Sequence, residues 1–282
     1  MSADRIGLRG ALWQPLGVAR RKPYGEHTIM GAVNGWTVER VATCPSTNVE
    51  LAHRAMEGEV TPKFAMVADY QTAGIGRGDR KWITPPEGAL TFSALINPDV
   101  PNDKKGPLPL FVGLAVCRAL ESFGLPAKLK WPNDILLPAA TPTSKLGEYR
   151  KVGGILCQII LNVGAIVGIG INILQNENEL PVPDATSLAL AGKPLNRDDL
   201  LEEILKNLDA ICAEWETDGP KHLISEYESR CASIGRQVSL EDYGASETIR
   251  GTVQEIADDG AIVVELASGA LTSRHFGDLY HF

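Results

Sequence analysis

The sequence lacks any apolar run of 18 or more residues, and its first residues do not follow the charged-then-apolar pattern of a secretion signal. It also has little positive charge, because 27 Lys and Arg stand against 35 Asp and Glu, which gives a formal net charge of -8. These absences argue against a membrane-spanning protein and against a general binder of nucleic acid or anionic membranes. We expect a cytoplasmic protein that binds neither nucleic acid nor a membrane. Any basic site should be confined to a small part of its surface.

Paired cysteines are absent as well. The five cysteines are odd in number, lie far apart and form no C-x-x-C, so neither a disulfide framework nor a zinc site is indicated. Four of them lie in or beside apolar runs and are typical of small core residues. With 282 residues, 44% of them hydrophobic, the chain can bury the core of one large domain, or of a large domain and a small one.

Hydrophobic periodicity divides the chain into strands and helices. Alternating or continuous apolar runs predict strands within residues 36–43, 64–71, 89–97, 128–137 and 151–173. Helical spacing and helix-start residues predict helices from residue 46, over 107–123 and over 196–219. In the last of these, Asn196 is the expected N-cap, and Gly219 followed by proline ends the helix.

Three segments are predicted to lie outside this main block. Residues 1–36 show no strong period and are expected to be an extension, and the Pro- and Thr-rich segment 138–150 is expected to be an exposed loop. From about residue 235 the chain consists of short strands separated by turns, which predicts a small barrel of about five strands. Such a barrel has a marginal core alone and is expected to pack on the main domain.

The stretch QTAGIGRGDRKW, residues 71–82, combines glycines with basic side chains. Gly74, Gly76 and Gly78 permit backbone N–H groups to converge on an anion, and Arg77 and Arg80 add positive charge beside them. This chemistry suits phosphate, although the spacing is neither a Walker A nor a dinucleotide fingerprint. Taken alone, the stretch is as typical of a solvated surface turn as of an anion-binding loop.

Four further motifs each have a simple structural explanation. STN at 46–48 is typical of a helix N-cap, KWPND at 130–134 of a strand end with a proline turn, KVGG at 151–154 of a strand with an edge lysine, and GIGIN at 168–172 of a strand ending in a cap. Taken singly, none of them establishes a function.

Together the five motifs, in this order and at these spacings, closely resemble the biotin protein ligases over about residues 37–282. The resemblance implies an α+β fold: a mixed β-sheet with helices on one face, related to class II aminoacyl-tRNA synthetases, plus a small C-terminal SH3-like barrel. It implies a catalytic domain at 37–233 and the SH3-like domain at 234–282. Because residues 1–36 are too short for a winged helix-turn-helix, we expect the monofunctional type of the family.

The activity that the resemblance implies has two steps. Biotin and ATP give biotinyl-5'-adenylate and pyrophosphate, and a lysine of a biotin carboxyl carrier protein, as found in acyl-CoA carboxylases, then accepts the acyl group. The implied catalytic residues are Lys151, Arg77 and Arg80. The implied biotin contacts are Ser46, Thr47, Asn48, Gln71, Gly74, Gly76, Arg77, Lys151, Gly154, Gly168 and Gly170. The implied ATP contacts are Arg77, Arg80, Trp82, Asn133, Asp134, Lys151 and Asn172. Mg is expected to be held by phosphates and Asp134.

The chain departs from the usual G-R-G-R-x-G-R-x-W loop of this family at two places. Ile75 replaces the first arginine, and Gly78 with Asp79 replaces the usual x-G order. The loop is therefore less basic than the pattern, so it would hold an adenylate less tightly, or Ile75 would cover the biotin rings instead. A lipoate or related acyl-acid ligase, or a sensor without catalysis, remains as an alternative function. A monomer and a homodimer are both compatible with the sequence.

Overall fold

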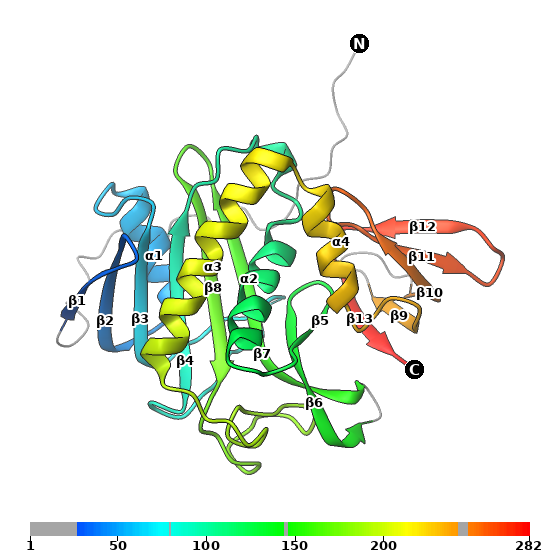
Figure 1. Ribbon diagram of the computed structural model, residues 1–282, viewed down its shortest axis with the longest axis horizontal. Helices are drawn as coiled ribbons and strands as arrows, with labels where there is room; N and C mark the ends of the chain where they lie inside the picture. Colours follow the sequence, from blue (N-terminus) through cyan, green and yellow to red (C-terminus); the bar gives the residue numbers. More distant parts are fainter. Residues whose placement is uncertain (1–26, 79, 144–145, 242–247) are drawn as a thin grey trace.

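The computed structural model describes residues 27–78, 80–143, 146–241 and 248–282 (Figure 1). Its elements in chain order are β1 His27–Val33, β2 Trp36–Cys44, α1 Thr47–Met56, β3 Phe64–Gln71, β4 Ala89–Ile96, a 3-10 turn Asn102–Lys104, α2 Leu108–Ser122, β5 Lys128–Lys130, β6 Asp134–Thr143, β7 Gly147–Ile160, β8 Gly164–Asn172, α3 Arg197–Asp218, α4 Lys221–Arg230, β9 Gln237–Glu241, β10 Thr248–Ile256, β11 Ile262–Leu266, β12 Leu271–Arg274 and β13 Asp278–His281. Among these residues, no helix is both long and apolar enough to cross a membrane.

Eight strands form one mixed sheet in the order β1-β2-β3-β4-β8-β7-β6-β5. Strands β2 and β3 pair in parallel, and the other neighbouring strands pair antiparallel. The parallel pair requires a crossover, which is supplied by α1. The predicted mixed sheet is therefore confirmed.

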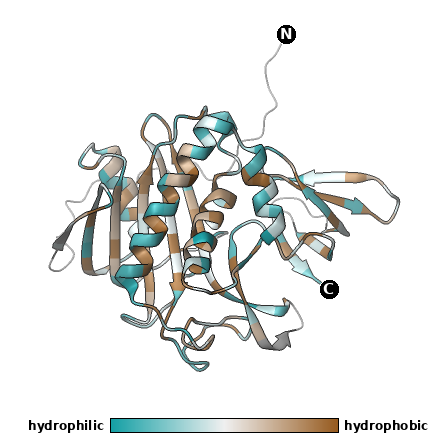
Figure 2. Ribbon diagram, in the orientation of Figure 1, coloured by the Kyte–Doolittle hydropathy of each residue, from teal (hydrophilic) through white to brown (hydrophobic). Residues whose placement is uncertain are grey.

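Both faces of this sheet carry helices. Successive side chains of a strand point to opposite faces, and in β4 Phe92 and Ala94 belong to the core beneath α2 and α3, whereas Leu95 packs with Leu51 and Ala55 of α1. Helices α2, α3 and α4 lie over one face (Figure 1), and the strands beneath them are apolar (Figure 2). The resemblance predicted helices on one face only, and this is wrong for α1. The apolar stripe of α1 is buried against the opposite face of the sheet.

Helix α3 forms where its capping residues and apolar spacing predict it. The side chain of Asn196 accepts hydrogen bonds from the backbone N–H groups of Asp198 and Asp199, and Gly219 has a positive φ of 75° at the C-terminus. The residues on its inner face are buried: Leu201, Ile204, Leu205, Leu208, Ile211 and Trp215. Helix α4, which follows directly, was not predicted.

Two segments differ from the sequence-based expectation. Residues 1–26 lie outside the described residues, but 27–33, expected to belong to the extension, form β1 and pair with β2. Segment 138–150, expected to be a loop, contributes to both β6 and β7, because Pro138 pairs with Tyr149 and Thr143 with Gly147. Strand pairing with a partner overrides the local turn composition in this segment.

The C-terminal strands form a separate five-stranded antiparallel sheet in the order β12-β11-β10-β9-β13, which confirms the small β-domain. This domain packs on the main domain, as expected. The indole N–H of Trp131 donates to the carbonyl of Gly260 at 3.1 Å. The backbone at Gly106 of the main domain lies close to Asp259 of the small domain: a Cβ on Gly106 would be 2.5 Å from the carbonyl oxygen of Asp259.

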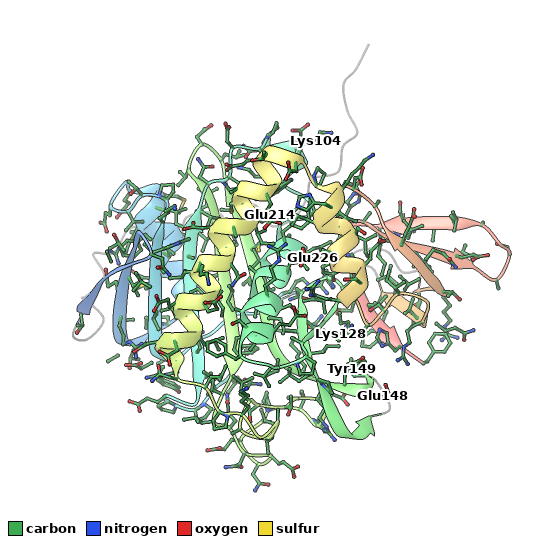
Figure 3. The ribbon with its side chains drawn as sticks, viewed as in Figure 1. Lys104, Lys128, Glu148, Tyr149, Glu214 and Glu226 are labelled. Atoms are coloured by element: carbon green, nitrogen blue, oxygen red, sulfur yellow. The ribbon has the colours of Figure 1, made fainter. Side chains whose placement is uncertain are left out.

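An ion-pair network joins the three helices on the outer face. Arg118 of α2 donates to Glu214 of α3 at 2.6 and 2.9 Å and to Glu226 of α4, where Nε lies 2.9 Å from the carboxylate (Figure 3). These hydrogen bonds lower the pKa of both Glu214 and Glu226 below the usual value of 4.5. The two carboxylates therefore bind protons less readily in the folded state than in the unfolded state.

This network predicts acid-sensitive stability. Because the folded pKa values are depressed, the stabilisation is complete above about pH 4.5 and is lost as the pH falls through the folded values. We expect Arg118→Met to lower the free energy of unfolding at pH 7 by about 1–3 kcal/mol, because two partly buried carboxylates lose a charged hydrogen-bond donor. Between pH 7 and pH 4 the variant should lose less stability than the wild type. Urea unfolding at both pH values measures this. Lys206→Met, which breaks the exposed pair with Glu203, is the control and should change stability by less than about 0.5 kcal/mol; equal losses in the two variants would contradict the prediction.

Candidate active site

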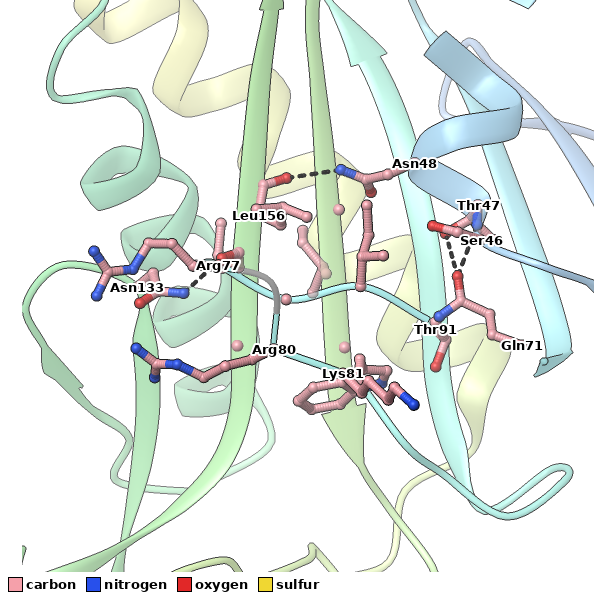
Figure 4. Close-up of a pocket in the computed structure, with 18 of the residues that line it drawn as sticks. Ser46, Thr47, Asn48, Gln71, Arg77, Arg80, Lys81, Thr91, Asn133 and Leu156 are labelled. Carbon is pink, nitrogen blue, oxygen red and sulfur yellow. Dashed lines mark hydrogen bonds between the residues drawn. The ribbon is translucent and has the colours of Figure 1, made fainter. Parts of the chain in front are cut away.

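A cavity lies on the sheet face that carries α1, where residues 71–82, the ligand loop, pass over β4, β8 and β7 (Figure 4). Thirteen of the predicted contacts line it, and so does Ile75: Ser46, Thr47, Asn48, Gln71, Gly76, Arg77, Arg80, Trp82, Asn133, Lys151, Gly154, Gly168 and Gly170. Segments more than 100 residues apart in the chain thus converge on one site, as the motifs predicted.

The ligand loop folds back on itself. The N–H of Gly76 donates to the carbonyl of Arg80 at 2.6 Å, and the N–H of Trp82 donates to Gly74 at 2.9 Å. Gly74 does not line the cavity; a Cβ there would lie 2.4 Å from the carbonyl oxygen of Trp82, so the turn requires glycine. A tightly bonded hairpin over a cavity does not fit the alternative of a solvated surface turn.

One end of the cavity is built from hydroxyl and amide groups. Thr47 and Asn48 begin α1, and the backbone N–H of Thr47 donates to Gln71 Oε1 at 2.7 Å. The amide of Asn48 donates to the carbonyl of Leu156 at 3.1 Å (Figure 4). Ser46 occupies the N-cap position but makes no capping hydrogen bond with its side chain. These groups present polar atoms to the cavity instead of serving only to cap the helix.

Glycines of β8 let two side chains contact the sheet directly. A Cβ on Gly168 would lie 1.9 Å from Oδ1 of Asn48, and a Cβ on Gly170 would lie 2.4 Å from the indole of Trp82. Both distances are shorter than any real carbon contact, so only glycine fits. The indole of Trp82 consequently contacts the floor of the cavity at Gly170 of β8, and its Cζ3 would lie 3.7 Å from a Cβ on Gly154 of β7.

Lys151 lies in β7 next to an irregularity in the strand pairing. Ile135 pairs with Gly153, but the next residue of β6, Leu136, pairs with Lys151, which leaves Val152 without a partner in β6. This bulge changes the alternation of side chains. As a result, the side chain of Lys151 lies on the face to which Gly154 points. A Cβ added to Gly154 would be 3.4 Å from Nζ of Lys151.

Asp134 carries a carboxylate between two lysines. Its Oδ1 lies 2.5 Å from Nζ of Lys151, and its Oδ2 lies 3.3 Å from Nζ of Lys130. Burial alone would raise the pKa of Asp134, but the two ammonium groups hold that pKa well below its usual range. Asp134 is therefore an anion at neutral pH, and it fixes the ammonium group of Lys151 at the wall of the cavity.

The two arginines of the ligand loop contact the C-terminal domain. Arg77 donates to the carbonyl of Gly277 and to the carboxylate of Asp278, each at 2.6 Å, and Arg80 pairs with the same carboxylate oxygen. Both arginine side chains extend from the loop away from the α1 end of the cavity (Figure 4). No local sequence pattern pointed to Asp278, because it lies about 200 residues from the loop.

Two predicted contacts have side chains outside the cavity lining. Asp134 lies behind Lys151, as described above. The amide of Asn172 donates to the carbonyl of Thr186 at 3.0 Å and accepts from Gln175 at 3.0 Å, so it holds the segment that follows β8. Asn133 does line the cavity, and its amide donates to the carbonyl of Ile155 at 2.8 Å.

The described residues contain no group of three His, Cys, Asp or Glu side chains that could hold a metal ion. Asp134 is the acidic side chain beside Lys151, and two lysines already neutralise it. A cage of protein carboxylates for Mg²⁺ therefore does not fit this site. The donor set fits an ion that keeps water and phosphate oxygens as most of its ligands.

Sequence comparison shows which known proteins the chain is similar to. Residues 41–176 match the Biotin/lipoate A/B protein ligase family, and residues 233–281 match the Biotin protein ligase C terminal domain. The chain is 30% identical over 272 residues to the biotin--[acetyl-CoA-carboxylase] ligase of Mycobacterium tuberculosis, covering 93% of this chain and 97% of that protein. It is 29% identical to the bifunctional ligase/repressor BirA of Escherichia coli, covering 84% of this chain and 72% of that protein.

Solved structures give the same result. A biotin protein ligase from Aquifex aeolicus in complex with biotin and ATP has a TM-score of 0.70 and 30% identity, covering 86% of this chain and 97% of that chain. A biotin protein ligase from Leishmania major in complex with biotinyl-5-AMP has a TM-score of 0.54 and 26% identity, covering 84% of this chain and 98% of that chain.

Proposed function

Because this chain belongs to the biotin protein ligase family, we propose that its cavity forms biotinyl-5'-adenylate from biotin and ATP and passes the biotinyl group to a lysine of a biotin carboxyl carrier domain. The observation that carries this proposal is the meeting, in one cavity, of a hydroxyl-amide end and a cationic end. The first end comprises Thr47, Asn48 and Gln71, and the second comprises Arg77 and Lys151. The first suits the polar head of biotin and the second suits its carboxylate and a phosphate.

The first step brings two anions together. The carboxylate oxygen of biotin attacks the α-phosphorus of ATP, the bond to the β-phosphate oxygen breaks, and pyrophosphate leaves. Lys151 and Arg77 lower the barrier by neutralising the carboxylate and the α-phosphate in the transition state. For this, Lys151 turns from Asp134 toward the substrates, and Lys130 continues to balance the charge of Asp134.

In the second step the neutral amine of the carrier lysine attacks the acyl carbon of the adenylate, the bond to the phosphate oxygen breaks, and AMP leaves with the electron pair. The nitrogen releases one proton to solvent as the amide forms. The mixed anhydride must be kept from water until then. The ligand loop, with Trp82 lying on the cavity floor, covers the site and can exclude water. Arg80 and Asn133 are proposed contacts of the nucleotide.

Several finer assignments belong to this proposal. Mg²⁺ would enter with the phosphates of ATP, since the described part of the chain offers Asp134 at this site and no cluster of carboxylates. Asn172 would act on the nucleotide through the segment that it holds. Residues 37–233 would form the catalytic domain, with β1 added to its sheet, and 234–282 the small domain. The carrier would be the biotin carboxyl carrier part of an acyl-CoA carboxylase, and the protein would act in the cytoplasm as a monomer or homodimer.

Exchange of labelled pyrophosphate into ATP tests the acid specificity. We expect exchange with biotin and none with lipoate or octanoate, because hydroxyl and amide groups line the head-group end of the cavity. Exchange with lipoate but not biotin would assign the protein to the acyl-acid ligases instead. Incubation with Mg²⁺-ATP, biotin and a carrier domain tests the second step. A carrier lysine of unchanged mass, together with tight biotin binding, would identify a sensor without catalysis.

A further inference from the structure

Ser93 is a polar residue in the middle of β4, where all eight positions are buried. Its side chain has no exposed area, and it does not line the cavity. By strand alternation it lies on the same face as Thr91 and Leu95, the face that carries α1. A hydroxyl at this depth must have hydrogen-bond partners, because an unpaired buried polar group is destabilising.

Those partners are two residues of the head-group end of the cavity. Ser93 Oγ lies 2.5 Å from Asn48 Oδ1 and 2.7 Å from Thr47 Oγ1. Thr47 Oγ1 in turn lies 3.1 Å from Gln71 Oε1. The four side chains therefore form a chain of three oxygen-to-oxygen contacts, which ends in an amide oxygen on each side.

The orientation of the two terminal amides is fixed from outside this chain of contacts. The carbonyl of Leu156 can only accept, so the amide nitrogen of Asn48 faces it at 3.1 Å and the oxygen of Asn48 faces Ser93. The backbone N–H of Thr47 can only donate, so the oxygen of Gln71 faces it at 2.7 Å. Both ends of the chain of contacts are thus acceptors, and neither amide can turn without losing a hydrogen bond.

The proton count follows from this arrangement. Three oxygen-to-oxygen contacts require three protons, but only Ser93 and Thr47 carry a hydroxyl proton. The network is therefore one donor short. A ligand N–H placed between Gln71 Oε1 and Thr47 Oγ1, and shared by these two acceptors, would supply the missing proton. Thr47 could then donate to Ser93 and Ser93 to Asn48, so that each of the three contacts holds a proton. A head group without N–H would leave the shortage in place.

We propose that Ser93 is a positioning residue that holds Thr47 and Asn48 in this donor-poor arrangement, and so selects an acyl acid whose head group carries N–H, such as the ureido ring of biotin. The inference rests on the proposed function, since it concerns the acid that the same cavity accepts. Ser93 acts through its two neighbours and does not touch the ligand.

Ser93→Ala tests this proposal. We expect the KM for biotin to rise about ten-fold, while the KM for ATP and kcat change less than about two-fold, because only the head-group end loses its orientation. The dissociation constant for biotin, measured by calorimetry without ATP, should rise by the same factor. Ser93→Thr keeps a hydroxyl and should retain most of the affinity for biotin. Ser93→Cys has a weak donor, so its affinity should lie between those of the wild type and the alanine variant. The cysteine variant replaces the alanine variant in this test if the latter does not fold.

Two controls separate positioning from stability. Leu95→Val, on the same face of the same strand, should lower stability slightly and leave the KM for biotin unchanged. In an Asn48→Ala background, Ser93→Ala should add less than about two-fold, because its main partner is gone. Unchanged or tighter biotin binding in Ser93→Ala, or an equal rise in both KM values, would overturn the inference. If the wild-type protein forms no adenylate with biotin, the proposed function itself fails.

Discussion

Replacing Lys151 with alanine is expected to slow biotinyl-adenylate formation by about 100-fold or more while leaving the protein folded. The ammonium group of Lys151 lies at the cavity wall, where Asp134 holds it. Its loss removes charge stabilisation that develops in the transition state. Folding should survive, because Lys130 still neutralises Asp134. Single-turnover formation of the adenylate, followed by quench and chromatography, measures the rate.

Lys130→Ala is the matched control, since it removes the other partner of the same carboxylate from a residue that does not line the cavity. It should lower the adenylation rate by less than about five-fold. Lys151→Ala leaves Asp134 with one cationic partner, and the added substitution Asp134→Asn removes the carboxylate charge. The double variant should therefore regain the free energy of unfolding lost in Lys151→Ala but not the adenylation rate. Wild-type adenylation in Lys151→Ala would show that another cation performs this role.

Gly168→Ala is expected to raise the KM for biotin about 100-fold. This effect is larger than that of Ser93→Ala, because the added methyl group pushes Asn48 out of place, whereas Ser93→Ala only removes one of its hydrogen bonds. The added Cβ would lie 1.9 Å from Oδ1 of Asn48, so Asn48 must leave its hydrogen bonds with Leu156 and Ser93. The KM for ATP should change far less, since the cationic end of the cavity is not touched. Steady-state pyrophosphate exchange with each substrate varied in turn measures both values.

Val167→Ala is the control for this variant. Val167 precedes Gly168 in β8, is fully buried, and belongs to the core on the opposite face of the sheet. It should lower the free energy of unfolding by about 1–3 kcal/mol and leave biotin binding unchanged. Similar KM values for biotin in the Gly168→Ala and Val167→Ala variants would mean that the close contact with Asn48 does not control binding.

The motifs and the periodicity predicted different parts of the molecule. The ligand loop, Lys151 and the residues 46–48 were predicted from short contiguous stretches, and the structure brings them to one cavity. Helix α3 was predicted because its N-cap, its apolar stripe and its terminal glycine all lie within the helix or next to it. In both cases the information is local in the chain.

What the sequence could not reveal depends on contacts between distant segments. Strand β1 and the hairpin of β6 and β7 exist because a partner strand is available, and no local pattern reports that partner. Asp278 reaches the ligand loop from the last strand of the chain. Ser93 is the exception, because a serine within the apolar run ALTFSALI was a visible signal of a buried polar contact.

The contact of Asp278 with Arg77 and Arg80 has a practical consequence for anyone who prepares this protein. A fusion partner or affinity tag joined directly after Phe282 would begin within a few residues of the carboxylate that holds both arginines. Strain or added charge there would be transmitted to the loop over the cavity, far from the tag in sequence. Comparing the ligase activity of otherwise identical preparations tagged at one end or the other would reveal this dependence before any site variant is made.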